Sequence, residues 1–304
     1  MANESAVAAP WTVLAACPAC RGALVDDEAL RCAACRRVFP IIDGVPRFVP
    51  DEAYAASFGL QWERHRSTQL DSVSGRPRSR DDFFAKTGLT PAELDGALVL
   101  DVGVGSGRYS EIAADHGARV VGIDLSRAAG VAARNLAGRA RIAQADLFAP
   151  PFRDGTFDVV FAIGVLHHTP DTRSATASIA RLVKPGGILA IWVYAHTFAG
   201  HFSNLYRRVT TRLGPETLYR LSAAGSALYQ LHGVPVVGRL LRTAVPISTE
   251  PNREWRILDT FDWYAPTYQW HHTPDEVAGW FDALGFEDVR RLPPPVAVRG
   301  RKPA

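Results

Sequence analysis

The feature that most constrains the fold is a glycine-rich turn at residues 98–108, which read LVLDVGVGSGR. The apolar run 98–100 predicts a buried strand that ends at Asp101, and residues 109–115 are typical of a helix. Glycine lets the backbone turn tightly and lets a ligand lie against it, while the start of the helix offers unpaired N–H groups. The stretch therefore predicts a nucleotide site, although it does not identify the nucleotide. Three glycines at alternate positions form the turn: Gly103, Gly105 and Gly107.

The turn departs from the dinucleotide-binding pattern in two ways. That pattern needs glycine or alanine three residues after its second glycine, so that strand and helix pack closely, but Arg108 stands there. An acid directly before the glycines, here Asp101, is also foreign to it. The stretch instead resembles motif I of the class I S-adenosylmethionine (SAM) methyltransferases.

Two further predicted strands each end in an acid, residues 119–123 before Asp124 and residues 141–145 before Asp146. A carboxylate at the end of the second strand can accept both ribose hydroxyls of a nucleoside, in SAM and NAD enzymes alike. The resemblance implies that Asp146 binds the adenine amino group. It also implies apolar contacts to the cofactor from three further side chains: Leu125, Leu147 and Ile163.

Residues 151–171 read PFRDGTFDVVFAIGVLHHTPD and resemble motif IV of the type 11 methyltransferases. A turn and a strand follow in residues 181–194. Strand and helix signals that alternate at this spacing predict a doubly wound parallel α/β sheet with ligands at the carboxyl ends of its strands. The resemblance implies a Rossmann-like sheet of seven strands, closed by a helix at 273–285 and an antiparallel hairpin at 286–299.

All four cysteines lie near the start of the chain, in two Cys-x-x-Cys pairs a short hairpin apart. Four thiolates at this spacing can converge on one structural zinc, which would stabilise a segment too short to fold on an apolar core. The continuation RVFPIIDGVPRF at 37–48 resembles the Trm112-like zinc ribbons. The predicted ligands are Cys17, Cys20, Cys32 and Cys35.

The chain divides into three predicted parts: a zinc ribbon at residues 1–50, a helical lid or linker at 51–95, and a methyltransferase domain at 96–304. A helical insertion at about 196–257 interrupts the last part. Its helical segments are apolar and rich in arginine. Such an insertion is expected to cap the substrate, and contact with a membrane or a partner protein is the other interpretation.

Composition limits the partners and the location. A formal net charge of +3 over 304 residues is too small to imply binding to nucleic acid or to an anionic membrane. No apolar run approaches the length needed to span a bilayer. The N-terminal residues also lack the basic start and the unbroken apolar core of a signal peptide. We therefore expect a cytoplasmic protein.

Methyl transfer from SAM depends mainly on placing the acceptor atom in line with an already activated methyl group. A general base helps where the acceptor carries a proton, and histidine suits that role near neutral pH. The same side chains can instead bind the substrate or cap a helix. The candidate catalytic residues are first His167 and His168, then His271 and Tyr194.

The favoured interpretation is a methyltransferase acting on an oxygen, nitrogen or carbon of a small molecule, either a secondary metabolite or a glycan or lipid precursor. One alternative is methylation of a base in rRNA or tRNA, with the ribbon binding RNA. Another is a non-catalytic partner protein with the SAM fold, which the intact acids at the strand ends disfavour. A homodimer is also open.

Overall fold

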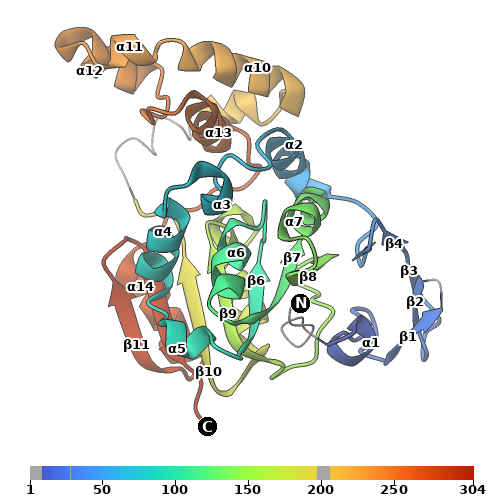
Figure 1. Ribbon diagram of the computed structural model, residues 1–304. Coiled ribbons are helices and arrows are strands. Elements are labelled where there is room, and N and C mark those ends of the chain that lie inside the picture. The colour runs from blue at the N-terminus through green and yellow to red at the C-terminus, as the bar shows by residue number, and fades with distance from the viewer. Residues whose placement is uncertain (1–8, 28, 197–205) are drawn as a thin grey trace.

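The protein is described by a computed structural model that covers residues 9–27, 29–196 and 206–304. Its centre is a seven-stranded sheet with the order β11-β12-β10-β9-β6-β7-β8 (Figure 1). All neighbours are parallel except β12, which is antiparallel to both β10 and β11. The predicted doubly wound sheet and its closing hairpin are confirmed. The strands are β6 (Leu98–Val102), β7 (Arg119–Asp124), β8 (Ala140–Gln144), β9 (Phe157–Ile163), β10 (Val183–Trp192), β11 (Glu287–Leu292) and β12 (Ala297–Arg301).

Chain order reverses between β6 and β9, so the loops after these two strands leave the sheet in opposite directions and open a crevice. Helices cover both faces because neighbouring side chains of a strand point to opposite sides. Leu100 packs in the cluster that contains α8 and α14, while Val99 packs with α4, α5 and α6. The covering helices are α4 (Arg78–Thr87), α5 (Pro91–Leu94), α6 (Arg108–Asp115), α7 (Ala128–Leu136), α8 (Thr172–Ala180) and α14 (Pro274–Ala283).

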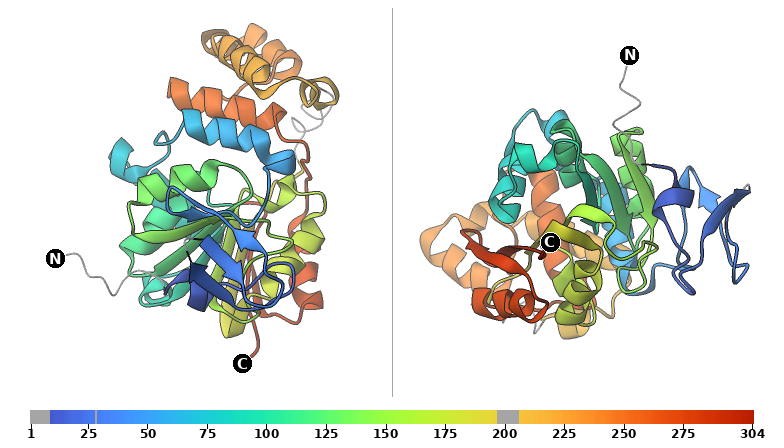
Figure 2. Two further views of the ribbon diagram at one scale, coloured as in Figure 1. Left: turned by 90° about the vertical axis from the view of Figure 1, so that its right-hand side faces the viewer. Right: turned by 90° about the horizontal axis from the view of Figure 1, so that it is seen from below.

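The N-terminal segment forms a small separate layer against the β8 edge of the sheet, at the opposite end from the β11–β12 hairpin (Figures 1 and 2). The Phe48 N–H donates to the Gln144 carbonyl oxygen at 2.8 Å, and Arg47 Nη1 donates to Gln144 Oε1 at 2.6 Å. The Trp11 ring stacks on Phe152. These contacts tie the segment to the sheet. Its elements are α1 (Trp11–Leu14), β1 (Leu24–Asp27), β2 (Ala29–Cys32), β3 (Val38–Phe39), β4 (Ile41–Ile42) and β5 (Val45–Pro46).

Short helices connect this segment to the sheet, within the residues 51–95 for which the sequence analysis expects a helical lid or linker. They are η2 (Ala53–Ala55), α2 (Ala56–Arg64), α3 (Asp71–Ser74), and then α4 and α5. α2 packs against α7 and crosses the carboxyl ends of the strands on the β7 side (Figure 1). The first part of the lid segment therefore covers the crevice.

The described part of the predicted insertion is mostly helical, with turns at 211–214 and an irregular stretch at 245–252, while residues 197–205 lie outside the described residues. Residues 206–210 are helical, and α10 (Pro215–Ser226), α11 (Tyr229–His232), α12 (Pro235–Ala244) and α13 (Arg253–Tyr264) follow. α13 continues beyond residue 257 and packs under α10 (Figure 1). Within the described ranges, every helix is too short or too polar to cross a bilayer.

Candidate active site

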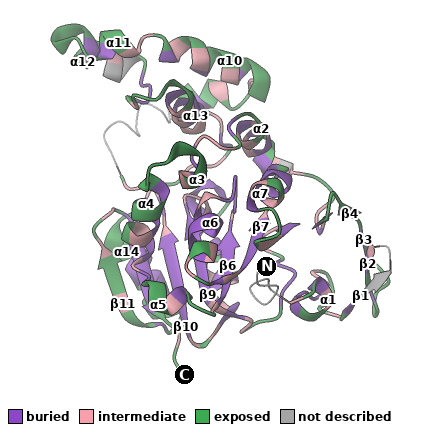
Figure 3. Cartoon of the chain, in the orientation of Figure 1, coloured by how far each residue is buried: buried purple, intermediate pink, exposed green. Residues whose placement is uncertain are grey.

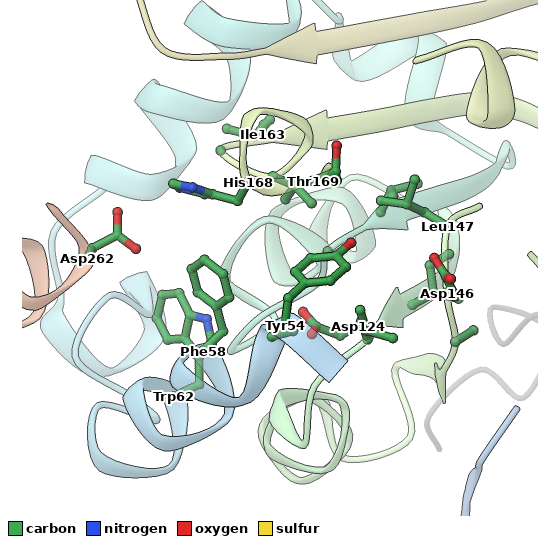
Figure 4. A pocket seen from close by; sticks show the side chains of 18 residues that line it. Tyr54, Phe58, Trp62, Asp124, Asp146, Leu147, Ile163, His168, Thr169 and Asp262 are labelled. Atoms are coloured by element: carbon green, nitrogen blue, oxygen red, sulfur yellow. The ribbon is translucent and has the colours of Figure 1, made fainter. Parts of the chain in front are cut away.

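A cavity of about 750 Å³ lies at the carboxyl ends of β6, β7, β8 and β9. Figure 4 shows Asp146 at one end of it, Asp262 at the other, and Asp124 between them. Aromatic side chains from η2 and α2 face the ends of the strands across the cavity: Tyr54, Phe58 and Trp62 (Figure 4). The sheet thus supplies the floor, and the lid segment supplies an aromatic roof.

The glycine turn is conformationally restricted and tightly packed. Gly103, Gly105 and Gly107 all have positive φ, at 74°, 54° and 89°, a region that disfavours other residues. A Cβ on Gly103 would lie 2.3 Å from Val165 Cγ2, and one on Gly105 would lie 3.1 Å from the Trp62 ring. Gly103 lines the cavity, whereas Gly107 lies outside it and begins α6.

Asp124 lines the cavity at the end of β7 and also holds the turn in place. Its Oδ2 accepts the Gly105 N–H at 3.0 Å, and its Oδ1 accepts the Ser126 N–H and hydroxyl at 2.8 and 2.7 Å. Burial raises the pKa of Asp124, and these donors partly offset that shift. The carboxylate is positioned for a further donor in the cavity.

The remaining predicted cofactor residues divide into two groups. The first group lines the cavity and consists of Asp146, Leu125, Leu147 and Ile163. Within it, Asp146 Oδ1 accepts the Phe148 N–H at 2.9 Å. Asp101 does not line the cavity, because its side chain is buried beneath the turn and accepts the Ser110 hydroxyl at 2.8 Å. Burial raises the pKa of Asp101 to about 7. Its role in this structure is to support the turn from below.

A second cavity of about 1010 Å³ continues from the first. Its walls include the aromatic side chains of Trp192, Tyr194 and Trp255. Five residues line both cavities and therefore mark the junction between them: Trp62, Gly103, Ile163, Gly164 and Asp262. Of the described residues that line both, only Asp262 is ionisable.

Asp82 is the centre of a cluster of charges on one wall of the second cavity. It accepts from Lys86 Nζ at 2.7 Å, Arg108 Nη2 at 3.0 Å and the Tyr109 hydroxyl at 2.7 Å. Burial alone would raise the pKa of Asp82, but the two cations outweigh it and lower the pKa. Lys86 Nζ also lies 4.0 Å from the centre of the Trp192 ring. One carboxylate and two cations meet on this wall, so these three groups together carry one net positive charge.

The two tip histidines have different environments although they are neighbours in η3 (Leu166–His168). His167 is fully buried, stacks on Tyr194 with ring centres 3.9 Å apart, and lines neither cavity. Neither ring nitrogen has a hydrogen-bond partner in the described part of the chain. His168 lines the first cavity and donates from Nδ1 to the Tyr268 carbonyl oxygen at 2.9 Å. Burial lowers the pKa of His168, so Nε2 is an acceptor at neutral pH.

Tyr194 and His271 complete the predicted set. Tyr194 lines the second cavity and donates its hydroxyl to Asp262 Oδ2 at 2.7 Å. His271 lines neither cavity, and burial lowers its pKa to about 4. The structure thus brings His168, Tyr194 and Asp262 together and leaves His167 and His271 outside the cavities.

Sequence reasoning missed Asp262 and the helix that carries it. Asn252 directly precedes α13 and caps it, because its side chain accepts the Trp255 N–H at 3.0 Å. Spacings of three and four residues place one face of α13 toward the second cavity. The spacing of these residues in the sequence could therefore have indicated this face of the helix. The residues on this face are Trp255, Leu258, Asp259 and Asp262.

The four cysteines converge within the N-terminal segment. Their sulfur atoms all lie within 4.8 Å of one another, with Cys17 to Cys35 at 3.7 Å and Cys20 to Cys32 at 3.4 Å. These separations are too long for disulfides. Tetrahedral zinc with bonds of about 2.3 Å requires sulfur atoms roughly 3.8 Å apart, which the cluster nearly matches.

Two stretches of the chain match known protein families. Residues 100–191 match the family described as a methyltransferase domain, and residues 14–44 match the Trm112p-like proteins. The chain is 39% identical over 150 residues to a ubiquinone biosynthesis O-methyltransferase of Thiobacillus denitrificans, which covers 46% of this chain and 60% of that protein. It is 31% identical over 159 residues to the O-methyltransferase resE of Aspergillus sclerotiorum, covering 45% and 60%.

A solved structure of a putative SAM-dependent methyltransferase from Methanococcus maripaludis aligns with a TM-score of 0.47 at 15% identity, covering 82% of this chain and 94% of that one. The chain spans about three fifths of the length of the curated relatives named above. The family matches agree with the strand order, the acids at the strand ends and the cysteine cluster. Residues 100–191 are therefore similar to the type 11 methyltransferase domains, and residues 14–44 before them are similar to the Trm112p-like proteins.

Proposed function

We propose that this protein transfers a methyl group from SAM to a hydroxyl oxygen of a small aromatic molecule. The observation that carries the proposal is the junction of the two cavities, where Asp262 meets the glycine turn. The relatives named above are O-methyltransferases, which supports oxygen as the acceptor atom.

The polar and apolar groups that line the first cavity support SAM as its ligand. Asp124 offers a buried carboxylate for the two ribose hydroxyls, Asp146 can accept from the adenine amino group, and Leu147 lies where it can cover the ring. Gly103 has no room for a side chain, so backbone is exposed to the ligand at the junction. When bound there, SAM would supply an electrophilic methyl group.

The second cavity fits an aromatic acceptor. Trp192 and Trp255 offer flat apolar faces on which an aromatic ring could lie. The acceptor hydroxyl would lie near Asp262, because the methyl group and the oxygen must meet at the junction.

Asp262 would take the proton of the acceptor hydroxyl. The Tyr194 hydroxyl donates to Asp262 Oδ2 at 2.7 Å, so Oδ1 of Asp262 remains available for a second donor. His168 is a neutral acceptor on the same side of the first cavity, and it would receive the hydrogen bond if the acceptor sits deeper. Proton removal by a positioned base contributes about 10²- to 10⁴-fold to a rate.

We also propose that the cysteine cluster binds one structural zinc. With four thiolates, all coordination positions are filled, so the metal would stabilise the fold and would not bind substrate. The contacts of Phe48 and Arg47 with Gln144 then connect this segment to the strand that precedes Asp146.

The test begins with calorimetric titration of the zinc-loaded protein with SAM and then with NADH. Binding of SAM in the micromolar range, lost in Asp124→Ala, is the expected result. If the folded protein binds no SAM, the enzymatic proposal fails and the non-catalytic interpretation takes its place.

A second step tests the acceptor class. Radiolabelled SAM is incubated with a panel of phenols and catechols, using native protein, Asp262→Asn and His168→Gln. We expect Asp262→Asn to lower kcat by about 10²-fold or more while SAM affinity stays within about threefold. If SAM binds but no aromatic hydroxyl in the panel is methylated, the acceptor assignment is wrong and the methyltransferase assignment stands.

A further inference from the structure

The helical insertion exposes an unusual amount of apolar surface. In the described part of the chain, sixteen large apolar side chains are exposed, and nine of them lie between residues 206 and 245. That segment is only about an eighth of the protein, so the exposure is concentrated there. The nine are Tyr206, Val209, Leu221, Leu231, Val234, Val236, Val237, Leu240 and Val245.

α12 is the clearest example. Val236 and Leu240 are 74% and 68% exposed, and their spacing of four residues puts them on one side of the helix with Val237. Arg239 projects from a different side, by the same geometry. From 235 to 240, only Gly238 is buried. A helix of ten residues is marginal in water without a surface to cover its apolar side.

The same segment is cationic. Between residues 206 and 249 the sequence contains six arginines and a single acid, Glu216. Glu216 is already paired, since Arg64 Nη2 lies 2.6 Å from its Oε2. Arg208, Arg212 and Arg220 are exposed. Exposed apolar side chains and exposed arginines therefore occur together in this segment.

The surface also lies beyond the cavities, on the outermost helices of the molecule, where exposed positions dominate α11 and α12 (Figures 1 and 3). An apolar groove of about 650 Å³ opens beneath it, between α10 and α13, lined by Leu218, Leu221, Ile247 and Tyr264 among others. α13 forms both a wall of this groove and, through Asp262, a wall of the second cavity.

We propose that the α10–α12 surface binds the interface of a lipid bilayer that contains anionic lipids. The apolar side of α12 would enter the acyl boundary, and the exposed arginines would contact headgroup phosphates. A second copy of this chain is a poorer occupant, because two cationic surfaces would face each other. The proposal is independent of the methyl-transfer reaction.

The test is flotation of the full-length protein with vesicles. One set is phosphatidylcholine alone, and the other is an equimolar mixture of phosphatidylcholine and phosphatidylglycerol. The native protein should bind the mixed vesicles at least about tenfold more tightly, and added salt should weaken that binding. The double variant Val236→Glu with Leu240→Glu should bind the mixed vesicles at least about tenfold more weakly. It replaces the two apolar side chains that would enter the bilayer with charged ones.

Two controls separate this effect from misfolding. Val73→Glu places one such charge on a similarly exposed valine, 63% exposed, in α3 away from the surface, and should bind as the native protein does; the single variant Val236→Glu, which adds the same one charge, should bind more weakly. The double variant Arg212→Gln with Arg220→Gln keeps every apolar contact, and it should lose about tenfold on mixed vesicles only. SAM titration of each variant reports whether the first cavity is intact.

Three outcomes would overturn the proposal. The first is a native protein that binds neither vesicle set. The second is equal binding to both sets, which would remove the role of the arginines. The third is a dimer in analytical ultracentrifugation that Val236→Glu with Leu240→Glu dissociates, without any vesicle binding by the native protein, since the surface would then be an interface between copies.

Discussion

Substitution of Asp146 by asparagine tests how the first cavity would recognise adenine. Asp146 Oδ1 already accepts the Phe148 N–H at 2.9 Å, so Oδ2 is the atom left for the ligand. In Asp146→Asn the amide oxygen retains the Phe148 contact, and the amide nitrogen takes the place of Oδ2. A donor would then face the donor of the adenine amino group.

The magnitude follows from the lost interaction. A hydrogen bond to a charged group contributes about 1.5–3 kcal/mol. Its loss predicts a Kd for SAM that is about 10- to 150-fold weaker. The assay is calorimetric titration of native and variant protein with SAM, and then with an analogue that carries hypoxanthine in place of adenine. The variant should bind the analogue better than the native protein does, because its amide nitrogen can donate to the hypoxanthine oxygen.

Asp171 provides a matched control. Its Oδ1 accepts the Ser174 N–H at 2.8 Å at the start of α8, outside both cavities. Asparagine caps helices as well as aspartate does, so Asp171→Asn should leave stability and SAM affinity unchanged. SAM binding by Asp146→Asn within about threefold of the native value would refute the reasoning about adenine.

Three further predictions concern stability. Because burial raises the pKa of Asp101 from 3.8 to about 7, the native chain holds a proton that the unfolded chain has released between these values. The free energy of unfolding should therefore fall as pH rises from about 4 to 7, by up to about 1.4 kcal/mol per unit, and urea titrations should show a flatter dependence for Asp101→Asn. Gly103→Ala should abolish SAM binding and lower the stability of the fold more than Gly96→Ala does. Both glycines have positive φ, but a Cβ at Gly96 meets nothing within 4 Å. Equal melting temperatures of the two variants in thermal unfolding would contradict this. Elemental analysis should find one zinc per chain, and Cys32→Ala should lose the metal and lower Tm; a full zinc content in that variant would exclude the cysteine site.

Much of the fold and part of the candidate site could be predicted because their signals are local. The glycines, Asp124 and Asp146 follow directly after apolar runs, and parallel strands bring their carboxyl ends to one edge of the sheet. The cysteine spacing is equally local and closes within one hairpin. In these places, neighbouring residues alone determine the geometry.

The rest depends on packing that no single stretch encodes. Trp62 and Asp262 meet at the junction although 200 positions separate them, because α2 and α13 both pack over the crevice. Asp101 shows the converse, since it occupies the expected position in the motif but points into the core toward Ser110. His167 and His168 carry the same side chain, and only the turn of η3 decides which one reaches the cavity.

The proposed membrane surface and the proposed active site share helices, which leads to a last prediction. α10 packs on α13, which carries Asp262, and it is tied to α2, which carries Trp62. Two contacts form the link between α10 and α2. The Tyr219 hydroxyl is hydrogen-bonded to His65 Nε2 at 2.9 Å, and Arg64 forms an ion pair with Glu216. If vesicles shift α10, SAM affinity should change on vesicles, and SAM should change vesicle affinity by the same factor. Tyr219→Phe, which keeps the ring but loses the hydrogen bond, should reduce that factor; SAM affinities equal within about twofold with and without mixed vesicles would show that the two surfaces act independently.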